Sequence, residues 1–150
     1  MQLTRADIAA LIPHAGTMCL LDGVVRSDAN RIRCIAETHR DAGNPLRMNG
    51  QLPALCGIEY AAQAMAVHGG LMWQQQGKMR SRPRAGYLAS VRDVVCGRER
   101  MDDLEGSLFV EAEKILGDGD HVIYEFRVWV GETEILSGRA AVVLDAGTPT

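Results

Sequence analysis

The chain has 150 residues, of which 47% are hydrophobic, and its 16 Lys and Arg against 19 Asp and Glu give a net charge of -3. This charge excludes the basic surface typical of nucleic-acid-binding proteins, and the length predicts a single domain, residues 1–150, with a buried core. No stretch approaches the roughly 20 apolar residues of a membrane span, and the N-terminus does not resemble a secretory signal. We therefore expect a cytoplasmic protein with neither nucleic acid nor membrane among its partners.

The four cysteines are far apart in the sequence, and no two of them form a Cys-x-x-Cys pair. Scattered cysteines inside regular elements predict reduced thiols rather than a disulfide framework. They also provide no zinc motif, so no bound metal is expected. The residues are Cys19, Cys34, Cys56 and Cys96.

The first predicted element is a short helix from Arg5 to Leu11. Thr4 is suited to cap its N-terminus, and Asp7 stands where a capping box places the second partner. Pro13 then ends the helix.

A β-hairpin follows this helix. Extended structure is predicted from Leu20 to Val25, and a polar turn at 27–30 comes next. The strand after the turn shows the alternation of a half-buried strand, with Ile32, Cys34, Ala36 and Thr38 at every second position.

The segment from Gly57 to Trp73 has apolar residues at helical spacing on nearly every side, after a loop from Asn44 to Leu55 that contains Pro and Gly. A helix that is apolar all round is buried. Its many small residues allow other elements to approach closely.

Four strands are predicted after this helix, and Gly-containing turns separate the last three in the manner of an antiparallel meander. With the hairpin, they make roughly six strands and one central helix. The fold class is α+β, a hotdog fold in which a curved sheet wraps the helix. Gly138 and Ala140 are expected to leave room where the helix crosses the last strand. The strands are Tyr87–Cys96, Ser107–Leu116, His121–Val130 and Glu134–Leu144.

Motifs of the serine hydrolase elbow, the P-loop and the Rossmann turn are all absent, so these three kinds of site are not supported. The candidate catalytic residues lie instead in the loop that leads into the long helix. Free N–H groups at the start of a helix can polarise a thioester carbonyl, and Gly57 has no side chain to keep a ligand away. Glu59, in the first turn, can exchange a proton nearby. A first-turn glutamate is also favoured by the helix dipole alone, but Gln63 follows at i+4 on an apolar helix, so both are expected to be half-buried and to face something specific.

Two segments carry motifs of a known enzyme family. Ile12-Pro13-His14 with Leu20-Leu21-Asp22-Gly23-Val24, and Asn49-Gly50-Gln51-Leu52-Pro53 with Glu59-Tyr60-Ala61-Ala62-Gln63-Ala64, span about residues 11 to 70. They resemble the Ile-Pro-His and Leu-Val-Asp run, the Gly-His-Phe-Pro loop and the Glu-Ala-Met-Ala-Gln helix start of the hotdog 3-hydroxyacyl-acyl-carrier-protein dehydratases. The resemblance is strongest to the dehydratase-like proteins of aryl polyene clusters.

One departure from that family affects the chemistry. In the family the loop histidine removes the α-proton while the helix carboxylate handles the β-hydroxyl, but here the histidine position is Gln51, which cannot act as a general base. The loop from Gln51 to Glu59 is also shorter than the family pattern. By motif, His14 is the nearest substitute, although its counterpart in the family is structural.

Other nucleophiles and bases are weaker candidates. His68 lies about 13.5 Å along the helix from Glu59 at 1.5 Å per residue, and His39 and His121 fall near strand ends, where surface positions are expected. Cys56 is a nucleophile only if the helix N-terminus lowers its pKa, and a small buried thiol is the commoner case.

The resemblance implies dehydration of a 3-hydroxyacyl thioester to the 2-enoyl form in fatty-acid or polyene assembly. The acyl chain would be linked through pantetheine to an acyl carrier protein, and no cofactor is needed. Glu59 and His14 would be catalytic, and Gly57, Gln51 and Gln63 would bind substrate. A homodimer or a heterodimer with another hotdog subunit is expected. The alternatives are a hotdog acyl thioesterase, or a silent subunit that partners an active dehydratase.

Overall fold

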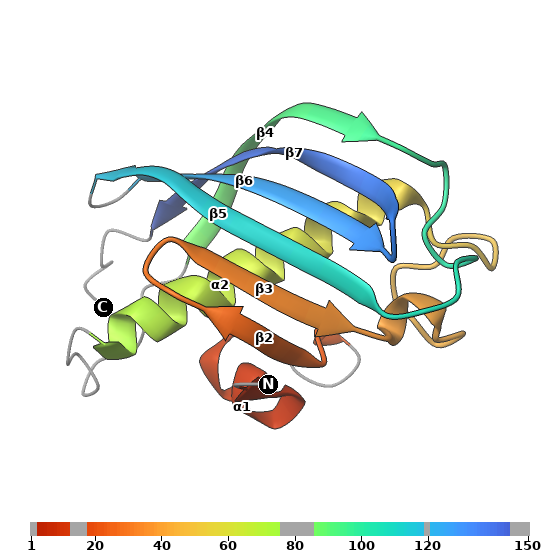
Figure 1. Cartoon of the computed structure of the whole chain (residues 1–150), viewed down its shortest axis with the longest axis horizontal. Helices are drawn as coiled ribbons and strands as arrows, with labels where there is room; N and C mark the ends of the chain where they lie inside the picture. The colour runs from red at the N-terminus through yellow and green to blue at the C-terminus, as the bar shows by residue number, and fades with distance from the viewer. Residues whose placement is uncertain (1–2, 13–17, 76–85, 119–120, 145–150) are drawn as a thin grey trace.

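The structure, a computed structural model, describes residues 3–12, 18–75, 86–118 and 121–144. Figure 1 shows a broad antiparallel sheet laid over one long helix, with a short helix beside the first strands. The helices are α1 (Arg5–Leu11) and α2 (Gly57–Gln75), with 3-10 turns η2 (Thr38–Arg40) and η3 (Ala54–Cys56); the strands are β1 (Leu3–Thr4), β2 (Gly23–Ser27), β3 (Arg31–Ala36), β4 (Gly86–Cys96), β5 (Leu108–Asp118), β6 (His121–Val130) and β7 (Thr133–Leu144).

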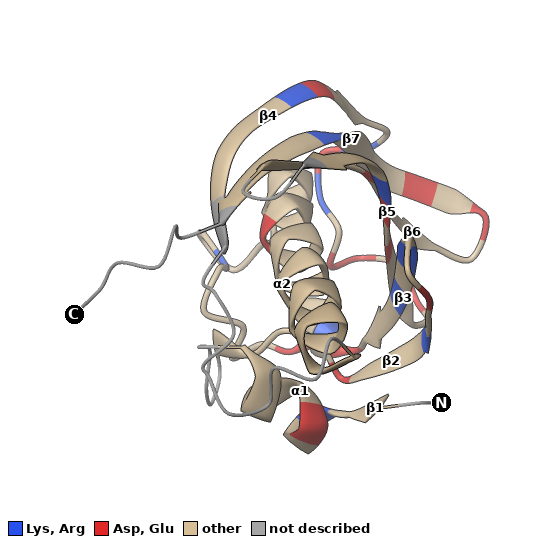
Figure 2. Cartoon of the chain, turned by 90° about the vertical axis from the view of Figure 1, so that its left-hand side faces the viewer, with Lys and Arg blue, Asp and Glu red and all other residues tan. Residues whose placement is uncertain are grey.

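Across the described residues the strands form one seven-stranded sheet in the order β1-β2-β3-β5-β6-β7-β4. Every neighbouring pair is antiparallel. Figure 2, viewed close to the axis of α2, shows the sheet curving around the helix. The predicted arrangement of a curved sheet around one long helix is therefore confirmed.

The predicted elements and the observed ones agree closely. The predicted hairpin is β2–β3, and the predicted meander is β5–β6–β7. Thr4 and Asp7 form the predicted capping box at α1. The sequence missed β1, because a strand of two residues is too short to show alternation. It also carried the hairpin strand to Thr38, which instead begins η2 while its hydroxyl donates to the Leu20 carbonyl at 2.6 Å.

The two faces of the sheet have opposite character, as period-two alternation requires. The face toward α2 is fully buried and apolar, with Ile32, Cys34, Ala36, Leu108, Val110, Ala112, Phe126, Val128, Leu136 and Ala140. The outer face carries a ladder of cross-strand ion pairs, including Arg31–Glu113 at 2.9 Å, Arg33–Glu111 at 2.9 Å and Arg127–Glu134 at 3.0 Å. One face of the sheet is therefore core, and the other faces water.

The small residue at the crossing of α2 and β7 is on the helix, and Gly138 does not leave room for the helix as predicted. A Cβ on Gly138 would lie 2.8 Å from Cζ of Phe126, so the ring on the neighbouring strand fills that space. A Cβ on Gly57 would lie only 2.4 Å from Cδ2 of Leu136. The small residue that admits the crossing is thus Gly57.

The edge strand β4 has an irregular second half. Its pairing with β7 shifts register between Leu88 and Ser90 and again between Arg92 and Val95. Asp93, within the second shift, has φ of 55°, which is uncommon for a residue with a side chain. Leu88 and Val95 are exposed on this strand. The outward edge of β4 has no partner within the described chain.

A buried histidine ties the centre of α2 to the sheet. His68 is fully buried, with Nδ1 2.7 Å from the Tyr124 hydroxyl and Nε2 2.8 Å from the Asp28 carbonyl oxygen. Since a carbonyl only accepts, Nε2 carries the proton and Nδ1 accepts from Tyr124 in the neutral ring. Burial lowers the pKa of His68, and the charge of Lys114 lowers it further.

The buried neutral histidine predicts that acid weakens the fold. A histidine in the unfolded chain takes up a proton below about pH 6.5, whereas His68 resists protonation. The free energy of unfolding should therefore be full above pH 6.5 and fall below it, by at most about 1.4 kcal/mol per pH unit for this group. Urea titrations at pH 7.5 and 5.5 measure this loss.

His39 is also buried with a lowered pKa and adds to the same trend. His68→Gln should therefore reduce the pH dependence without removing it, whereas the exposed His121→Gln should leave the dependence unchanged. An equal loss of stability with acid in His68→Gln and wild type would contradict the assignment.

Candidate active site

The candidate site lies where η3 runs directly into α2. Glu59, in the first turn of α2, is exposed, as is Gln51 on the loop before η3. Met48 and Leu55 in the same stretch are large apolar side chains that are 64% and 57% exposed. Exposed apolar side chains around a carboxylate are typical of a surface that binds a ligand or a partner.

The backbone of Gln51 is held in a tight hairpin. Met48 and Gln51 exchange two backbone hydrogen bonds of 2.7 and 3.0 Å. The two residues between them, Asn49 and Gly50, have φ of 54° and 76°, values that Asn and Gly adopt more easily than other residues. The side chain at position 51 is therefore presented from a well-defined turn.

The role predicted for Gly57 must be revised. Its N–H donates to the carbonyls of Ala54 and Leu55, because η3 extends the helical path backwards and uses this donor. Its missing side chain accommodates Leu136 rather than a ligand. Gly57 is thus a packing position, and its amide is not a free donor for a thioester oxygen.

Gln63 and Glu59 share a helix face but lie in different surroundings. Gln63 is buried, accepting at 2.9 Å from the Leu20 N–H and donating at 2.7 Å to the Met18 carbonyl. The expectation that both are half-buried was therefore wrong. Gln63 anchors residues 18–20 on α2 one turn after Glu59. Its predicted contact with substrate stays a prediction, and His14 lies outside the described residues.

Cys56 has the surroundings of a structural thiol. It is half-buried, and its Sγ lies 3.8 Å from the carbonyl of Leu46. Burial raises the pKa of this thiol, and the negative charge of Glu59 raises it further. The raised pKa disfavours the thiolate, so a nucleophilic role for Cys56 is not supported.

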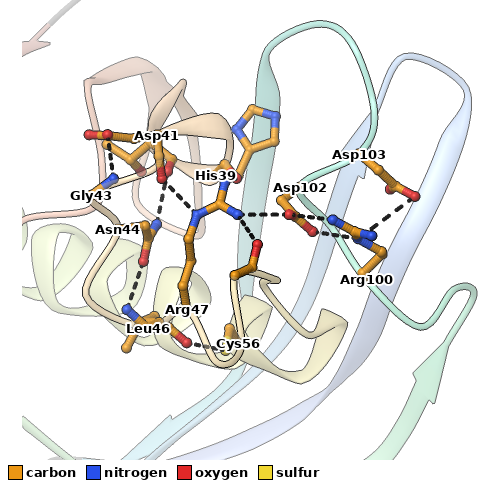
Figure 3. Close-up of polar contacts among 12 residues, drawn as sticks. His39, Asp41, Gly43, Asn44, Leu46, Arg47, Cys56, Arg100, Asp102 and Asp103 are labelled. Atoms are coloured by element: carbon orange, nitrogen blue, oxygen red, sulfur yellow. Dashed lines mark hydrogen bonds and ion pairs between the residues drawn. The ribbon is translucent and has the colours of Figure 1, made fainter.

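The described histidines offer no base beside Glu59. His39 was predicted at the surface but is fully buried, with Nε2 3.0 Å from the Gly106 carbonyl. Figure 3 shows its ring directed away from Cys56. His68 is committed to Tyr124 and Asp28, and His121 is exposed at the start of β6, as predicted.

The sequence missed Tyr60 as an organiser of this region. Its buried hydroxyl lies 2.8 Å from the Thr38 hydroxyl and accepts from the Asn44 amide at 2.9 Å. A tyrosine in a helix of Ala, Met and Gly was the available signal, because a buried hydroxyl needs partners. Tyr60 links η2 and the loop before η3 to the helix that carries Glu59.

A groove of about 530 Å³ on the outer face of the sheet is a poor acyl site. Its charged walls include Arg31 and Glu113, which pair with each other at 2.9 Å. Glu59 belongs to the helix on the opposite face. Within the described ranges, no group of three or more His, Cys, Asp or Glu could hold a metal. Likewise, no helix there is long and apolar enough to cross a membrane.

Comparison with known proteins places this chain in a family. The profile of the ApeP-like family, described as ApeP dehydratase, matches residues 6–147. The chain belongs to the ApeP-like dehydratase family. The dehydratase resemblance found in the sequence is thereby confirmed. Among curated proteins, none matches this chain.

Solved structures show the fold. The dehydratase heterocomplex ApeI:P from Xenorhabdus doucetiae is similar with a TM-score of 0.80 and 24% identity, over 94% of this chain and 92% of that one. A hypothetical thioesterase with coenzyme A from Streptococcus pneumoniae has a TM-score of 0.57 and 7% identity, over 81% and 84%. AziG from S. sahachiroi has a TM-score of 0.57 and 15% identity, over 89% and 97%. The predicted hotdog fold is confirmed.

Two glycines of α2 give a matched test of the crossing. Gly57→Ala should lower the free energy of unfolding by about 1–3 kcal/mol, because the methyl group overpacks against Leu136. Gly69→Ala should raise it by about 0.5–1 kcal/mol, because Gly69 is exposed with nothing within 4 Å and alanine favours the helix. Urea unfolding measures both, and equal effects would contradict the crossing described here.

Proposed function

We propose that this dehydratase converts a 3-hydroxyacyl thioester on an acyl carrier protein to the 2-enoyl form. His14 removes the proton from Cα, and the double bond forms between Cα and Cβ. Glu59 donates a proton to the β-hydroxyl, which departs as water. The observation that carries the proposal is an exposed carboxylate at the start of a buried helix in a chain of the dehydratase family. The pantetheine arm of the carrier protein delivers the substrate.

The described residues on either side of His14 support its approach to Glu59. Leu11 lies against α2 at Gly70, where its side chain would be 3.4 Å from a Cβ. Met18 is held by Gln63, one turn from Glu59. The described residues before and after the segment that contains His14 therefore both contact α2, and Met18 does so one turn from Glu59, since residues at i and i+4 are neighbours on one face.

A second hotdog subunit completes the site in this proposal. The η3 segment lies beside the residue stretch after β4, because the Ala54 N–H donates to the Glu99 carbonyl at 2.9 Å. Exposed Leu55 and the exposed Val95 therefore belong to the same end of the molecule as the free edge of β4. A strand edge with exposed apolar side chains favours pairing with another chain. The similarity to a dehydratase heterocomplex supports a heterodimer with another hotdog subunit, and a homodimer is the alternative.

A thioesterase is the second candidate, because Gln51 replaces the family's base and Glu59 can also activate water. The similarity to a thioesterase structure, at 7% identity, concerns the fold alone and does not distinguish a thioesterase from a dehydratase. A silent subunit that shapes the site of an active partner is the third. The products distinguish the three: an enoyl thioester, a free acid, or no conversion by the chain alone.

Glu59→Gln is the decisive variant. Glutamine keeps the size of the side chain but cannot exchange a proton, so turnover of 3-hydroxyhexanoyl-acyl carrier protein should fall by about 10²–10⁴-fold with the fold intact. Loss of water is followed by mass spectrometry, with the chain alone and with a co-purified hotdog partner. The exposed Glu132→Gln is the matched control and should turn over like wild type.

The second catalytic group is tested in the same assay. His14→Asn should reduce turnover by about 10²–10⁴-fold if His14 is the base. Full activity of His14→Asn would assign the base to the partner, and Gln51→His should then restore some turnover to the chain alone. Equal turnover of wild type and Glu59→Gln would remove Glu59 from the mechanism.

A further inference from the structure

One arginine holds together the loop that presents Gln51. Arg47 donates from Nε to the Asp41 carbonyl at 2.8 Å and from Nη1 to the Gly50 carbonyl at 2.8 Å. Its Nη2 lies 3.5 Å from the carbonyl of His39. Figure 3 shows the guanidinium at the centre of these contacts. A single side chain thus binds both the beginning and the end of the loop.

Arg47 also binds a buried carboxylate, that of Asp102. Asp102, in the connection between β4 and β5, accepts from Arg47 Nη1 at 2.9 Å and from Arg100 at 2.9 and 2.8 Å. The hydrogen bonds from Arg100, together with the nearby backbone N–H of Leu52, the residue after Gln51, hold the pKa of Asp102 well below its usual range. Its side chain is only 3% exposed, and that of Arg47 is 16% exposed.

The residues on both sides of Gln51 are therefore attached. Arg47, which is bound by Asp102, donates to the carbonyl of Gly50 before Gln51. Met101, the residue before Asp102, donates from its backbone N–H to the carbonyl of Leu52 after Gln51 at 2.9 Å. These contacts precede η3 directly, so they also determine where the start of α2 stands relative to Gln51.

We infer that Arg47 and Asp102 are positioning residues that fix Gln51 against the start of α2 and hence against Glu59. This inference rests on the proposed function. The pair does not touch the reacting atoms, and it acts through the backbone on either side of Gln51. Displacement of a group in an active site by about 1 Å can cost about 10²-fold in rate, so a loop that lacks regular structure needs such an attachment.

A neighbouring ion pair provides a matched control. Arg98 donates to Asp103 at 2.8 Å in the same connection between β4 and β5, and Asp103 is 38% exposed. None of its described contacts reaches residues 41–52. Removing the Asp103 charge therefore changes the same connection by one carboxylate without releasing the loop.

The first measurement needs no turnover. In 15N-labelled protein, Asp102→Asn should speed hydrogen exchange of the Gln51 amide, which donates to the Met48 carbonyl, about ten-fold or more, because the asparagine NH₂ opposes donors that the carboxylate accepts and the loop is released. Arg47→Lys should do the same, since a lysine keeps the charge but loses the forked contacts to separate carbonyls. Asp103→Asn should leave this exchange unchanged. If Asp102→Asn fails to fold, Arg47→Lys still decides the result.

The second measurement compares kcat with KM for 3-hydroxyhexanoyl-acyl carrier protein in the complex of the chain with its hotdog partner. Both loop variants should lower kcat by about 10–100-fold and raise KM by less, because the substrate bound at Gln51 is no longer aligned with Glu59. Unchanged exchange, or equal effects in Asp103→Asn, would overturn the inference. Faster exchange with wild-type kcat would overturn it too.

An inactive wild-type complex would contradict the proposed function instead. The positioning of Gln51 would then be decided by the exchange measurement, which does not depend on turnover.

Discussion

The arrangement around α2 follows from one constraint, which is that the polar side chains buried on this helix must form hydrogen bonds. The helix is buried along most of its length, yet it carries Tyr60, Gln63 and His68 among apolar residues. Tyr60 binds η2 and the loop before η3, Gln63 binds residues 18–20, and His68 binds the β2–β3 turn and β6. Each buried polar side chain therefore fixes a different segment around the helix. These hydrogen bonds therefore also fix the position of the segments around Glu59, which is on the same helix.

This arrangement separates the tasks of stability and chemistry within one element. The apolar surface of α2 fills the concave face of the sheet, and Gly57 allows the helix to cross close to Leu136. In the first turn Gly57 and Tyr60 are still buried, and Glu59 between them presents its carboxylate to solvent. On the other side of the site, Arg47 and Asp102 hold the loop of Gln51 through charged hydrogen bonds, while Leu52 at its end is fully buried in the core.

Local patterns predicted the fold well because each long element has a strong period. The bounds of α1 and β6 agree with the structure, and those of α2, β4, β5 and β7 differ by one or two residues. The site was less predictable. Motifs identified Glu59 and Gln51, but the contacts of Gly57, His39 and Asp102 depend on segments distant in sequence: β7, the residues before β5, and the loop of Arg47. No local pattern encodes such pairings.

The irregular half of β4 restricts what can join the sheet. An extended edge strand offers a row of N–H and C=O groups to any other strand, which makes it a liability for aggregation as well as a route to assembly. The shift between Arg92 and Val95, with Asp93 at positive φ, interrupts that row. The shifts between Leu88 and Ser90 and between Arg92 and Val95 leave no long regular run along β4, so a second strand aligned with this edge would meet an irregularity within a few residues. The outer edge of β4 is therefore a poorer template for repeated strand addition than a regular edge strand would be.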